Sequence, residues 1–399
     1  MMSEFTGRVP TLWQGRGVAR QMTKRLTAGR ETLVIADSAI EVPVLAEGAA
    51  RTVQVDAPSA DVTTVVTIAR EIVRRPPSVI IAIGGGTVLD AAKIAALALA
   101  GGRVFDYAIG HASRFALTLL PDAPPPVDIV AVSTTLGTSS ETNSVGILKN
   151  DNGYRLIVGR SLRPRHAIID PDNLSTLTPA AVREGAMEAF LRLAGASTSA
   201  RRSTRANGDA AALGRALLET AAGDTSSPAG RLRLARLSAA TQRTAALRGH
   251  DPYSARHWYV ANEVAFLLAV RKMVATAAII AAVWRRICAG DSRWGDRRSL
   301  EDFWARCASG LALPSDPSAG IAALVERWAI PRPPSPTAHD IRRISMATET
   351  SWGDRYPMLP HLVAEDFCDV LRDSHWSSQP VGAARHADLR TRWEGGESK

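Results

Sequence analysis

A run of glycines at residues 84–86 is the first feature of this sequence that could do chemistry. It follows the apolar stretch 78–83 and opens a helical pattern that contains Thr87 and Asp90. Glycine lets backbone N–H groups approach an anion closely, and the N-terminus of a helix adds a favourable dipole for phosphate. The spacing differs from the GxGxxG of a Rossmann fold. The run therefore predicts a phosphate-binding loop, and the alternative is a tight strand–helix turn that binds nothing.

A cluster of hydroxyl side chains at residues 133–142 is the second such feature. It follows the apolar stretch 128–132 and includes Thr134, Thr135 and Thr138. Hydroxyls at the carboxyl edge of a parallel sheet can donate to phosphate or ribose oxygens, and open α/β sheets bind ligands at that edge. The alternative is a turn rich in serine and threonine that caps a helix.

Strand and helix patterns alternate around these two motifs. The stretches 32–36, 78–83 and 128–132 are short and apolar throughout, whereas 63–73 and 89–99 have helical spacing. Strands buried on both faces and separated by helices are typical of a parallel α/β sheet. No strand is evident before Gly15-Arg16-Gly17, so we do not read those residues as a dinucleotide fingerprint.

The pattern becomes helical after Pro179 and stays so to about Leu371. We therefore expect an α/β nucleotide-binding domain at 1–180, an all-α domain at 181–376 and a disordered tail at 377–399. Residues 196–250, rich in Ala, Arg, Ser and Thr, could form loosely packed helix or a mobile insert. The longest apolar run, 273–284, is too short to span a bilayer and predicts a buried helix.

Composition limits the function classes. The chain has 399 residues, 46% of them hydrophobic and 22% charged, which is ordinary for a globular protein. The net charge of +9 alone would suit nucleic acid, but only 5% of residues are aromatic and no basic block alternates with them. The three cysteines are widely spaced, and the N-terminus does not read as a secretory signal. We expect a soluble cytoplasmic protein that binds neither nucleic acid nor membrane.

In combination, the glycine and threonine motifs resemble those of the iron-containing (group III) alcohol dehydrogenase family, relatives of dehydroquinate synthase. The resemblance covers roughly residues 10–375. Weaker marks agree: Gly15-Arg16-Gly17, Asp37, Ile168-Ile169-Asp170-Pro171, Leu177-Thr178-Pro179, and residues 344–371. It implies a dehydroquinate synthase-like architecture, with an α/β domain, a helical domain and the active site in the cleft between them. It also implies a homo-oligomer.

The resemblance implies a nicotinamide cofactor and the residues that hold it. The glycine motif (Gly85, Gly86, Thr87, Asp90) would contact the pyrophosphate and nearby ribose, Thr134, Thr135 and Thr138 the nicotinamide half, Leu177 the adenine side, and Asp37 the adenosine ribose. A carboxylate at Asp37 favours NAD over NADP, because it accepts from the 2′-hydroxyl and repels a 2′-phosphate. The alternative for Asp37 is a helix N-cap.

The implied metal site departs from the family pattern of one Asp and three His. Glu188 stands at the Asp position and Arg192 at the first His position, and His257 is the only histidine near the other two. An arginine places a fixed positive charge where the ion should lie. We therefore expect no divalent metal, with Glu188 as the one remaining ligand candidate.

Two functional interpretations follow. In one, the protein is an enzyme in which Arg192 stabilises the alkoxide and His257 or Glu263 is the general base. In the other, it is a non-catalytic nucleotide- or peptide-binding relative that acts as a partner subunit. Glu188 and Arg192 would then be an ordinary i, i+4 pair on a helix.

The substrate is the finest inference. An Arg- and Ala-rich group III dehydrogenase with altered metal ligands resembles the dehydrogenases of ribosomal peptide natural-product (RiPP) clusters, in particular the daptide-type pathway. The resemblance implies oxidation of a C-terminal threonine side chain of a precursor peptide, followed by loss of carbon dioxide, with a possible partner biosynthetic protein. The alternative is an ordinary small-alcohol dehydrogenase.

Overall fold

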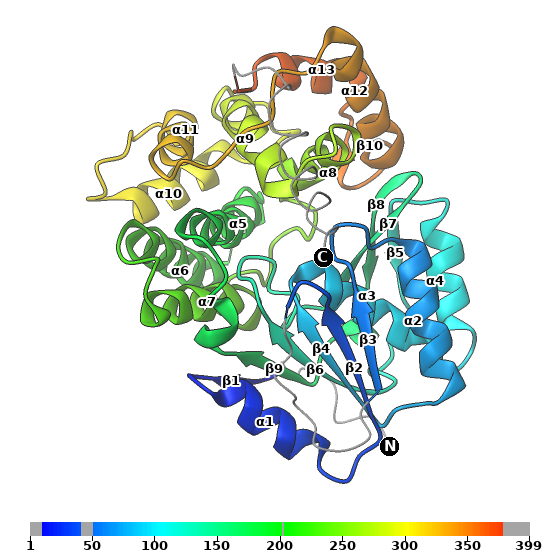
Figure 1. Cartoon of the computed structure of the whole chain (residues 1–399). Coiled ribbons are helices and arrows are strands. Elements are labelled where there is room, and N and C mark those ends of the chain that lie inside the picture. Colours follow the sequence, from blue (N-terminus) through cyan, green and yellow to red (C-terminus); the bar gives the residue numbers. More distant parts are fainter. Residues whose placement is uncertain (1–9, 41–50, 202, 378–399) are drawn as a thin grey trace, which may run out of the picture.

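A six-stranded parallel sheet in the order β1-β9-β6-β4-β2-β3 forms the centre of the first half of the chain (Figure 1). The computed structural model describes residues 10–40, 51–201 and 203–377. The strands of the sheet are β1 (Thr11–Gln14), β2 (Thr32–Asp37), β3 (Arg51–Val55), β4 (Val79–Gly84), β6 (Asp128–Ser133) and β9 (His166–Ile169). The predicted parallel α/β sheet is confirmed. However, β1 lies directly before Gly15, so the expectation of no strand there was wrong.

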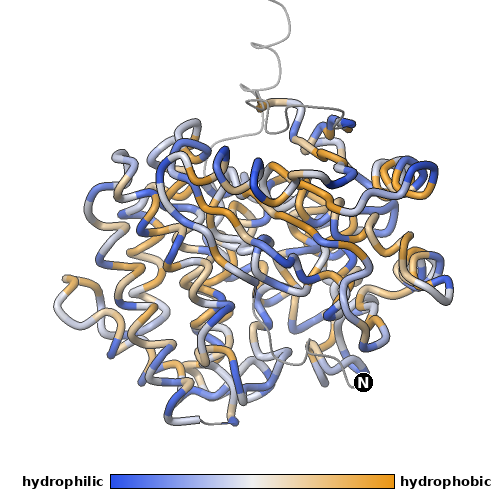
Figure 2. Tube along the Cα trace, turned by 90° about the horizontal axis from the view of Figure 1, so that it is seen from below, coloured by the Kyte–Doolittle hydropathy of each residue, from blue (hydrophilic) through white to orange (hydrophobic). Residues whose placement is uncertain are grey.

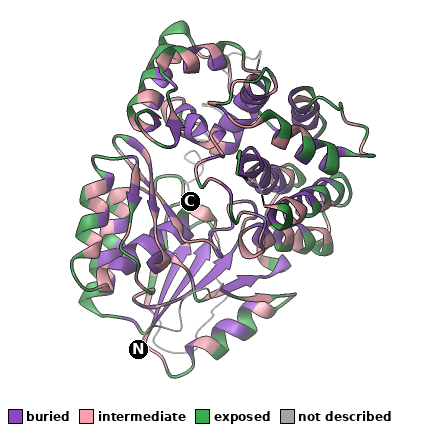
Figure 3. Ribbon diagram, turned by 180° about the vertical axis from the view of Figure 1, so that it is seen from behind, coloured by how far each residue is buried: buried purple, intermediate pink, exposed green. Residues whose placement is uncertain are grey.

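Alternating side chains of the sheet bury both of its faces. Leu33, Ile80 and Ile129 pack against helices on one face. Val34 and Ile81 pack against α1 on the other face. The helices are α1 (Val18–Thr27), α2 (Val62–Arg74), α3 (Gly86–Ala96) and α4 (Val104–Ala112), with a 3-10 turn at Leu97–Leu99. Figure 3 shows the sheet buried between these layers.

A smaller sheet flanks α3. It consists of β5 (Leu117–Leu119), β7 (Val145–Asn150) and β8 (Gly153–Val158), with β7 and β8 antiparallel and β5 parallel to β8. Gly146 of β7 lies so close to Ile94 of α3 that a Cβ there would be 2.7 Å from Ile94 Cγ1. The hairpin therefore packs directly on the helix that follows the glycine motif.

The second half of the chain is helical, as predicted, apart from two short strands. Its helices are α5 (Pro179–Ser197), α6 (Thr204–Ala222), α7 (Pro228–Arg243), α8 (His257–Leu267), α9 (Lys272–Cys288), α10 (Arg297–Ala308), α11 (Pro317–Arg327), α12 (Ala338–Trp352) and α13 (Ala364–Arg372). The two-residue strands β10 (Gly353–Asp354) and β11 (Leu359–Pro360) pair with each other, so this half is not all-α. The 3-10 turns Arg160–Leu162 and Pro171–Leu174 precede it.

Buried apolar faces hold these helices together. Phe190 of α5, Trp284 of α9 and Trp304 of α10 are buried and stack edge to face. Figure 2 shows hydrophobic and hydrophilic residues alternating along the helices. The described part of the stretch 196–250 contains α6 and α7, each with a buried face of leucine and alanine, so it is packed helix. Apart from Ser377, the expected tail lies outside the described residues. Within the described ranges, no helix combines the length and apolar character needed to cross a membrane.

The loop that follows β6 touches α5 through backbone. A Cβ added at Gly185 of α5 would lie 2.4 Å from the carbonyl oxygen of Leu136. Across the same contact, a Cβ at Gly137 would lie 2.8 Å from Gly185 Cα, and Gly137 has φ of +111°. Glycine at both positions allows the loop of the α/β half to contact the first long helix of the helical half.

We expect Gly185→Ala to lower the free energy of unfolding by about 1–3 kcal/mol, because the added methyl must push the loop away from α5. Gly208 on α6 is the matched control, since a Cβ there meets nothing within 4 Å. Gly208→Ala should be neutral or stabilising by up to about 1 kcal/mol. Urea unfolding of the two variants checks this, and equal effects would contradict the close contact.

Candidate active site

The glycine and threonine motifs meet at the carboxyl edge of the sheet. Gly84 and Ser133 are register partners at the ends of β4 and β6, and Thr134 N donates to Gly84 O at 3.1 Å. A Cβ at Gly85 would lie 3.2 Å from Thr135 Cγ2. A Cβ at Gly86 would lie 2.8 Å from Thr138 Cγ2. The structure therefore brings both predicted motifs into contact.

The N-terminus of α3 lacks a cap. Its N-cap residue is Gly85, no side chain accepts from the first-turn N–H groups, and the first turn carries no acidic residue. Gly85 and Gly86 are half-exposed and Thr87 is exposed. Unsatisfied N–H groups at an open helix N-terminus suit an anion. The pyrophosphate of a dinucleotide fits the residues present here.

Asp90 points inward rather than toward this opening. Its Oδ2 accepts from Ile147 N at 3.0 Å, and its Oδ1 lies 2.9 Å from Lys93 Nζ and accepts from Ser140 Oγ. Lys93 is fully buried and also donates to Asn143 Oδ1 at 3.0 Å. The pair links α3 to β7 and to residues 134–142, the loop after β6 that carries the threonine motif (the threonine loop). The carboxyl of Asp90 thus faces Lys93, Ser140 and β7. Its expected direct contact with the cofactor stays a prediction. We did not single out Lys93, although its spacing three residues after Asp90 was a signal.

Asp37 and Leu177 lie at the margins of the site. Asp37 ends β2 at the same edge of the sheet and is half-buried, and its Oδ1 accepts from Ala39 N at 3.0 Å. The described residues 38–40 contain no helix, so an N-cap role is not seen in them. Leu177 is partly buried and packs on the core of the helical half, just before α5.

Arg192 of α5 binds the threonine loop rather than open space. Its Nη2 donates to Thr138 O at 3.0 Å and to Gly137 O. Its Nη1 donates to Thr241 Oγ1 at 2.9 Å and Ser139 Oγ at 3.2 Å. Burial lowers the pKa of Arg192, and Glu188 and Glu141 oppose that shift. Both terminal nitrogens of Arg192 are therefore hydrogen-bonded within the fold, and the expected alkoxide-binding role stays a prediction.

Two buried or half-buried carboxyls lie in the field of Arg192. Burial raises the pKa of Glu141 to about 7, and Arg192 and Lys93 oppose this. Burial also raises the pKa of Glu188, with Arg192 and Lys272 opposing. Glu188 Oε2 lies 3.0 Å from the position a Cβ of Gly137 would take. Glu188 therefore lies against the threonine loop. The sequence predicted it only as a metal-ligand candidate, and Glu141 was not foreseen.

Lys272, the first residue of α9, completes this cluster. Its Nζ lies 4.8 Å from the ring centroid of Trp258. Burial lowers the pKa of Lys272 to about 8, an effect that Glu188 opposes and Arg192 reinforces. The ammonium thus lies in the field of Glu188. The Arg271-Lys272 pair directly before the apolar run was the available signal, yet Lys272 was not among the predicted catalytic residues.

These residues do not fit a divalent metal. The charged neighbours of Glu188 include two cations, Arg192 and Lys272, which repel an ion. Within the described ranges, no group of three or more His, Cys, Asp or Glu side chains is arranged to hold a metal. The metal of the family therefore has no ligand set in the described part of this chain.

The two candidate bases lie in different surroundings. Burial, reinforced by Lys272, lowers the pKa of His257 to about 3, so its ring is neutral at physiological pH and a weak proton acceptor. Its Nε2 has no partner among the described residues. Burial raises the pKa of Glu263 to about 7, and its Oε1 accepts from Trp352 Nε1 at 2.8 Å. Its charged neighbour is Arg155 rather than Lys272, so Glu263 lies apart from the cluster.

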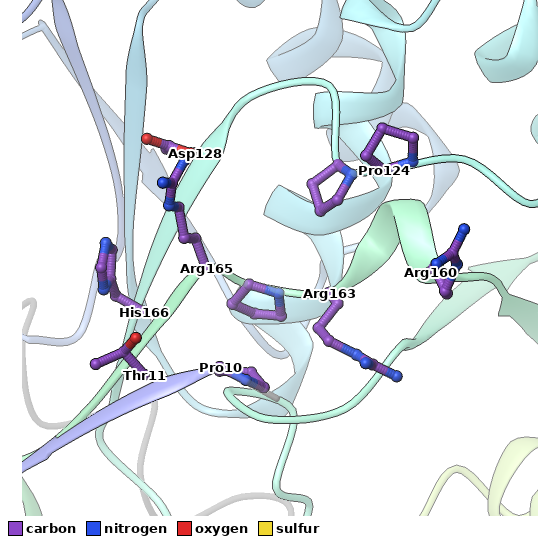
Figure 4. A pocket seen from close by; sticks show the side chains of 10 residues that line it. Pro10, Thr11, Pro124, Asp128, Arg160, Arg163, Arg165 and His166 are labelled. Atoms are coloured by element: carbon purple, nitrogen blue, oxygen red, sulfur yellow. Dashed lines mark hydrogen bonds and ion pairs between the residues drawn. The ribbon is translucent and has the colours of Figure 1, made fainter. Parts of the chain in front are cut away.

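A separate hollow of about 230 Å³ lies at the opposite edge of the sheet (Figure 4). It is lined by Thr11 and His166 at the amino ends of β1 and β9 and by several arginines. Arg165 is paired with Asp128 at 2.8 Å, and Arg160 with Asp122. Since the cofactor-type loops lie at the carboxyl edge, this hollow is not the candidate active site.

The fold joins a parallel α/β sheet to a helical half, and the glycine and threonine motifs meet at the carboxyl edge of that sheet. Comparison with known sequences shows what part of the chain is similar to a known family. Residues 10–171 match the sequence profile described as "Iron-containing alcohol dehydrogenase". This confirms the resemblance to that family.

Individual relatives agree. A phosphonoacetaldehyde reductase of Streptomyces viridochromogenes is 35% identical over 189 residues, 46% of this chain and 48% of the relative. A mitochondrial hydroxyacid-oxoacid transhydrogenase of Caenorhabditis briggsae is 35% identical over 108 residues, 26% of this chain and 22% of the relative. The chain thus matches about half the length, or less, of these curated relatives.

Solved structures match nearly the whole chain in fold. An NADH-dependent butanol dehydrogenase of Thermotoga maritima has a TM-score of 0.74 at 16% identity, covering 94% of this chain and 99% of that one. A sulfoacetaldehyde reductase of Bifidobacterium kashiwanohense, solved with NAD⁺, has a TM-score of 0.70 at 17% identity, covering 91% and 96%. The group III architecture therefore extends through the helical half.

We expect purified protein to contain no stoichiometric divalent ion. Adding Zn²⁺ or Fe²⁺ should leave its unfolding temperature unchanged, because an ion that binds the native state at about 100 times its Kd would stabilise it by about 3 kcal/mol. Elemental analysis and thermal unfolding with and without each ion check this. A stoichiometric ion that raises the unfolding temperature would contradict the misfit of Glu188 and its neighbours.

Glu263 should make stability depend on pH. Its pKa in the folded protein, about 7, lies above its ordinary value of 4.5. The folded state therefore binds the proton more tightly, and this stabilisation is complete below pH 4.5 and lost as pH rises through 7. Between about pH 5 and pH 8, the wild type should lose about 2 kcal/mol more unfolding free energy than Glu263→Gln. Urea titrations at both pH values measure the difference, and parallel losses would refute it.

Proposed function

We propose that this protein is an NAD-dependent oxidoreductase that interconverts an alcohol and its carbonyl compound without a divalent metal. The observation that carries the proposal is the contact of the two predicted motifs. The uncapped N-terminus of α3 and the threonine loop face each other at the carboxyl edge of the sheet. A Cβ added at Gly85 or Gly86 would lie 3.2 or 2.8 Å from the Cγ2 atom of Thr135 or Thr138, respectively. Such an edge is where open α/β sheets bind nucleotides.

Each part of the site has a separate task in this proposal. The N–H groups at Gly86 and Thr87 would hold the pyrophosphate, and Thr135 and Thr138 would face the nicotinamide half. When bound, the nicotinamide supplies a hydride donor or acceptor. Arg192 fixes the loop that carries Thr138 by donating to its backbone. Asp90 and Lys93 fix that loop from the other side through Ser140.

The choice of NAD over NADP rests on Asp37. Its half-buried carboxyl lies at the end of β2, one strand away from the glycine motif. A carboxylate there would accept from a ribose 2′-hydroxyl and repel a 2′-phosphate. Asp37→Ser should therefore narrow the preference for NADH over NADPH.

For the substrate, we propose a hydroxyl on a peptide natural-product precursor, with oxidation of a C-terminal threonine followed by decarboxylation. The misfit of the metal site supports this proposal, because a large substrate supplies binding energy far from the reacting carbon and offsets a missing metal. Oxidation at Cβ gives a β-keto acid, whose carbonyl accepts the electrons left when carbon dioxide departs.

A small aldehyde that carries an anion is the second candidate. Two relatives are named for such aldehydes, the phosphonoacetaldehyde reductase and the sulfoacetaldehyde reductase. Lys272, whose ammonium has no hydrogen bond among the described residues, supports this candidate as well, because a lysine ammonium binds oxyanions.

NADH should bind to the purified protein, and the change in NADH fluorescence should reach saturation during the titration. Gly86→Asp should abolish this saturation, because its carboxylate would enter the phosphate site and crowd Thr138. Gly101→Asp is the control, since a side chain at Gly101 meets nothing within 4 Å. A wild type that does not saturate, or a Gly86→Asp variant that still does, would refute the cofactor site.

The same preparation distinguishes the substrates. With NAD⁺ and any partner protein, a peptide ending in threonine should lose the mass of two hydrogen atoms and carbon dioxide. With NADH, phosphonoacetaldehyde, sulfoacetaldehyde and butanal test the small-aldehyde candidate. Cofactor binding without turnover of any of these would favour the non-catalytic relative.

A further inference from the structure

The start of α9 is fixed against α5 by an ion pair. Arg271 Nη1 lies 2.6 Å from Glu184 Oε2, and Glu184 is buried. Glu184 and Glu188 are one turn apart on α5, so they lie on the same face of that helix. Of the two adjacent basic residues, Arg271 therefore pairs with Glu184, and Lys272 lies in the electrostatic field of Glu188. Glu188 in turn acts electrostatically on Lys272 and opposes the lowering of its pKa.

Lys272 differs from its neighbours Arg192 and Arg271 in that its only direct contact given among the described residues is the ring of Trp258. Among the described residues, no hydrogen bond reaches its Nζ and no carboxylate lies within 4 Å, whereas Arg192 makes four hydrogen bonds and Arg271 an ion pair. Glu188 likewise has neither within the described part of the chain. Neither the ammonium of Lys272 nor the carboxylate of Glu188 is among the fully buried polar atoms that lack a hydrogen bond. Both groups are therefore open to a ligand.

The surroundings of Lys272 favour an oxygen as that ligand. The charged or titratable groups that act on it are Glu188 and Arg192 of α5 and Asp90 of α3, and it acts in turn on His257 of α8. His257 is 2% exposed, and its Nε2 has no partner among the described residues. The ring nitrogen of His257 is fully buried, whereas the ammonium of Lys272 is not among such buried atoms, so the ammonium keeps hydrogen-bonding capacity that a ligand or water can use.

We propose that Lys272 takes over the task of the missing metal: its ammonium binds the reacting oxygen of the substrate and exchanges a proton with it. This inference rests on the proposed function and names a catalytic residue for it. Glu188 is then a positioning residue, whose carboxyl favours the charged form of the ammonium.

The step balances without a metal. In the reducing direction, the hydride from reduced nicotinamide forms a bond to the carbonyl carbon, and the C=O π pair moves to the oxygen. The oxygen takes a proton as an Nζ–H bond of Lys272 breaks, which leaves a neutral amine that regains a proton from water. Oxidation reverses these events, with the neutral amine as base. A positioned acid of this kind contributes about 100-fold to 10,000-fold in rate.

The lowered pKa of Lys272, about 8, suits both directions near neutral pH. The reduction rate should fall as pH rises through about 8, because the acid is lost, and the oxidation rate should rise over the same range. Lys272→Arg keeps the charge but stays protonated, so it should remove this pH dependence and slow both directions.

The test combines a binding measurement with kinetics. NADH is titrated with and without isobutyramide, an inert carboxamide whose carbonyl oxygen imitates that of an aldehyde. In the wild type, isobutyramide should tighten NADH binding. Lys272→Met, which has a similar length and good helix propensity, should bind NADH alone as the wild type does but lose this tightening. Lys24→Ala, at an exposed position of α1, is the control and should behave as the wild type.

Kinetics use butanal and phosphonoacetaldehyde. Lys272→Met should lower kcat for both by about 100-fold or more, and added ethylamine should restore part of it. A raised KM for phosphonoacetaldehyde alone, with kcat unchanged, would show that Lys272 binds the distant anion and would overturn the proposal. The proposal would also be overturned if isobutyramide tightened NADH binding in Lys272→Met as much as in the wild type. It would equally be overturned if the wild type bound NADH but isobutyramide did not tighten that binding. Failure of NADH to bind at all would refute the proposed function itself, and this inference with it.

Discussion

The contact between the threonine loop and α5 is the constraint on which the rest of the site depends. Gly137 and Gly185 meet backbone to backbone, and Arg192 donates from α5 to the carbonyls of Gly137 and Thr138. An arginine that satisfies two carbonyls and two hydroxyls fixes several groups at once, and it could not also wait unpaired for a substrate. The same interaction therefore joins the two halves and engages both terminal nitrogens of Arg192.

A consequence is that the two cations beside Glu188 differ in their contacts. One cation, Arg192, serves the fold, and a second, Lys272, remains without a direct partner among the described residues. A buried cation is costly unless it is paired, so an unpaired one at half burial needs either water or a ligand. Glu188 lowers this cost without closing on the ammonium.

Sequence alone predicted the elements whose pattern is local. The long apolar strands β2, β4 and β6 were foreseen because each reads as an unbroken apolar run, and the helical second half because its period is regular. The four-residue strand β1 was missed, since its pairing with β9 comes from residues 155 positions away (Thr11 with His166). The glycine and threonine motifs were placed correctly at one edge because parallel strands end together.

The roles of charged side chains were harder to foresee, because spacing does not show direction. Asp90 follows the glycine motif at helical spacing, but whether it faces the opening or Lys93 depends on Ser140 and Ile147, which lie 50 and 57 residues further along. Arg192 and Lys272 look alike in sequence, and only the carbonyls of the threonine loop distinguish them. The mismatch of Glu188 and Arg192 with the metal ligands of the family was visible in the sequence, whereas the contacts that separate Arg192 from Lys272 depend on the fold.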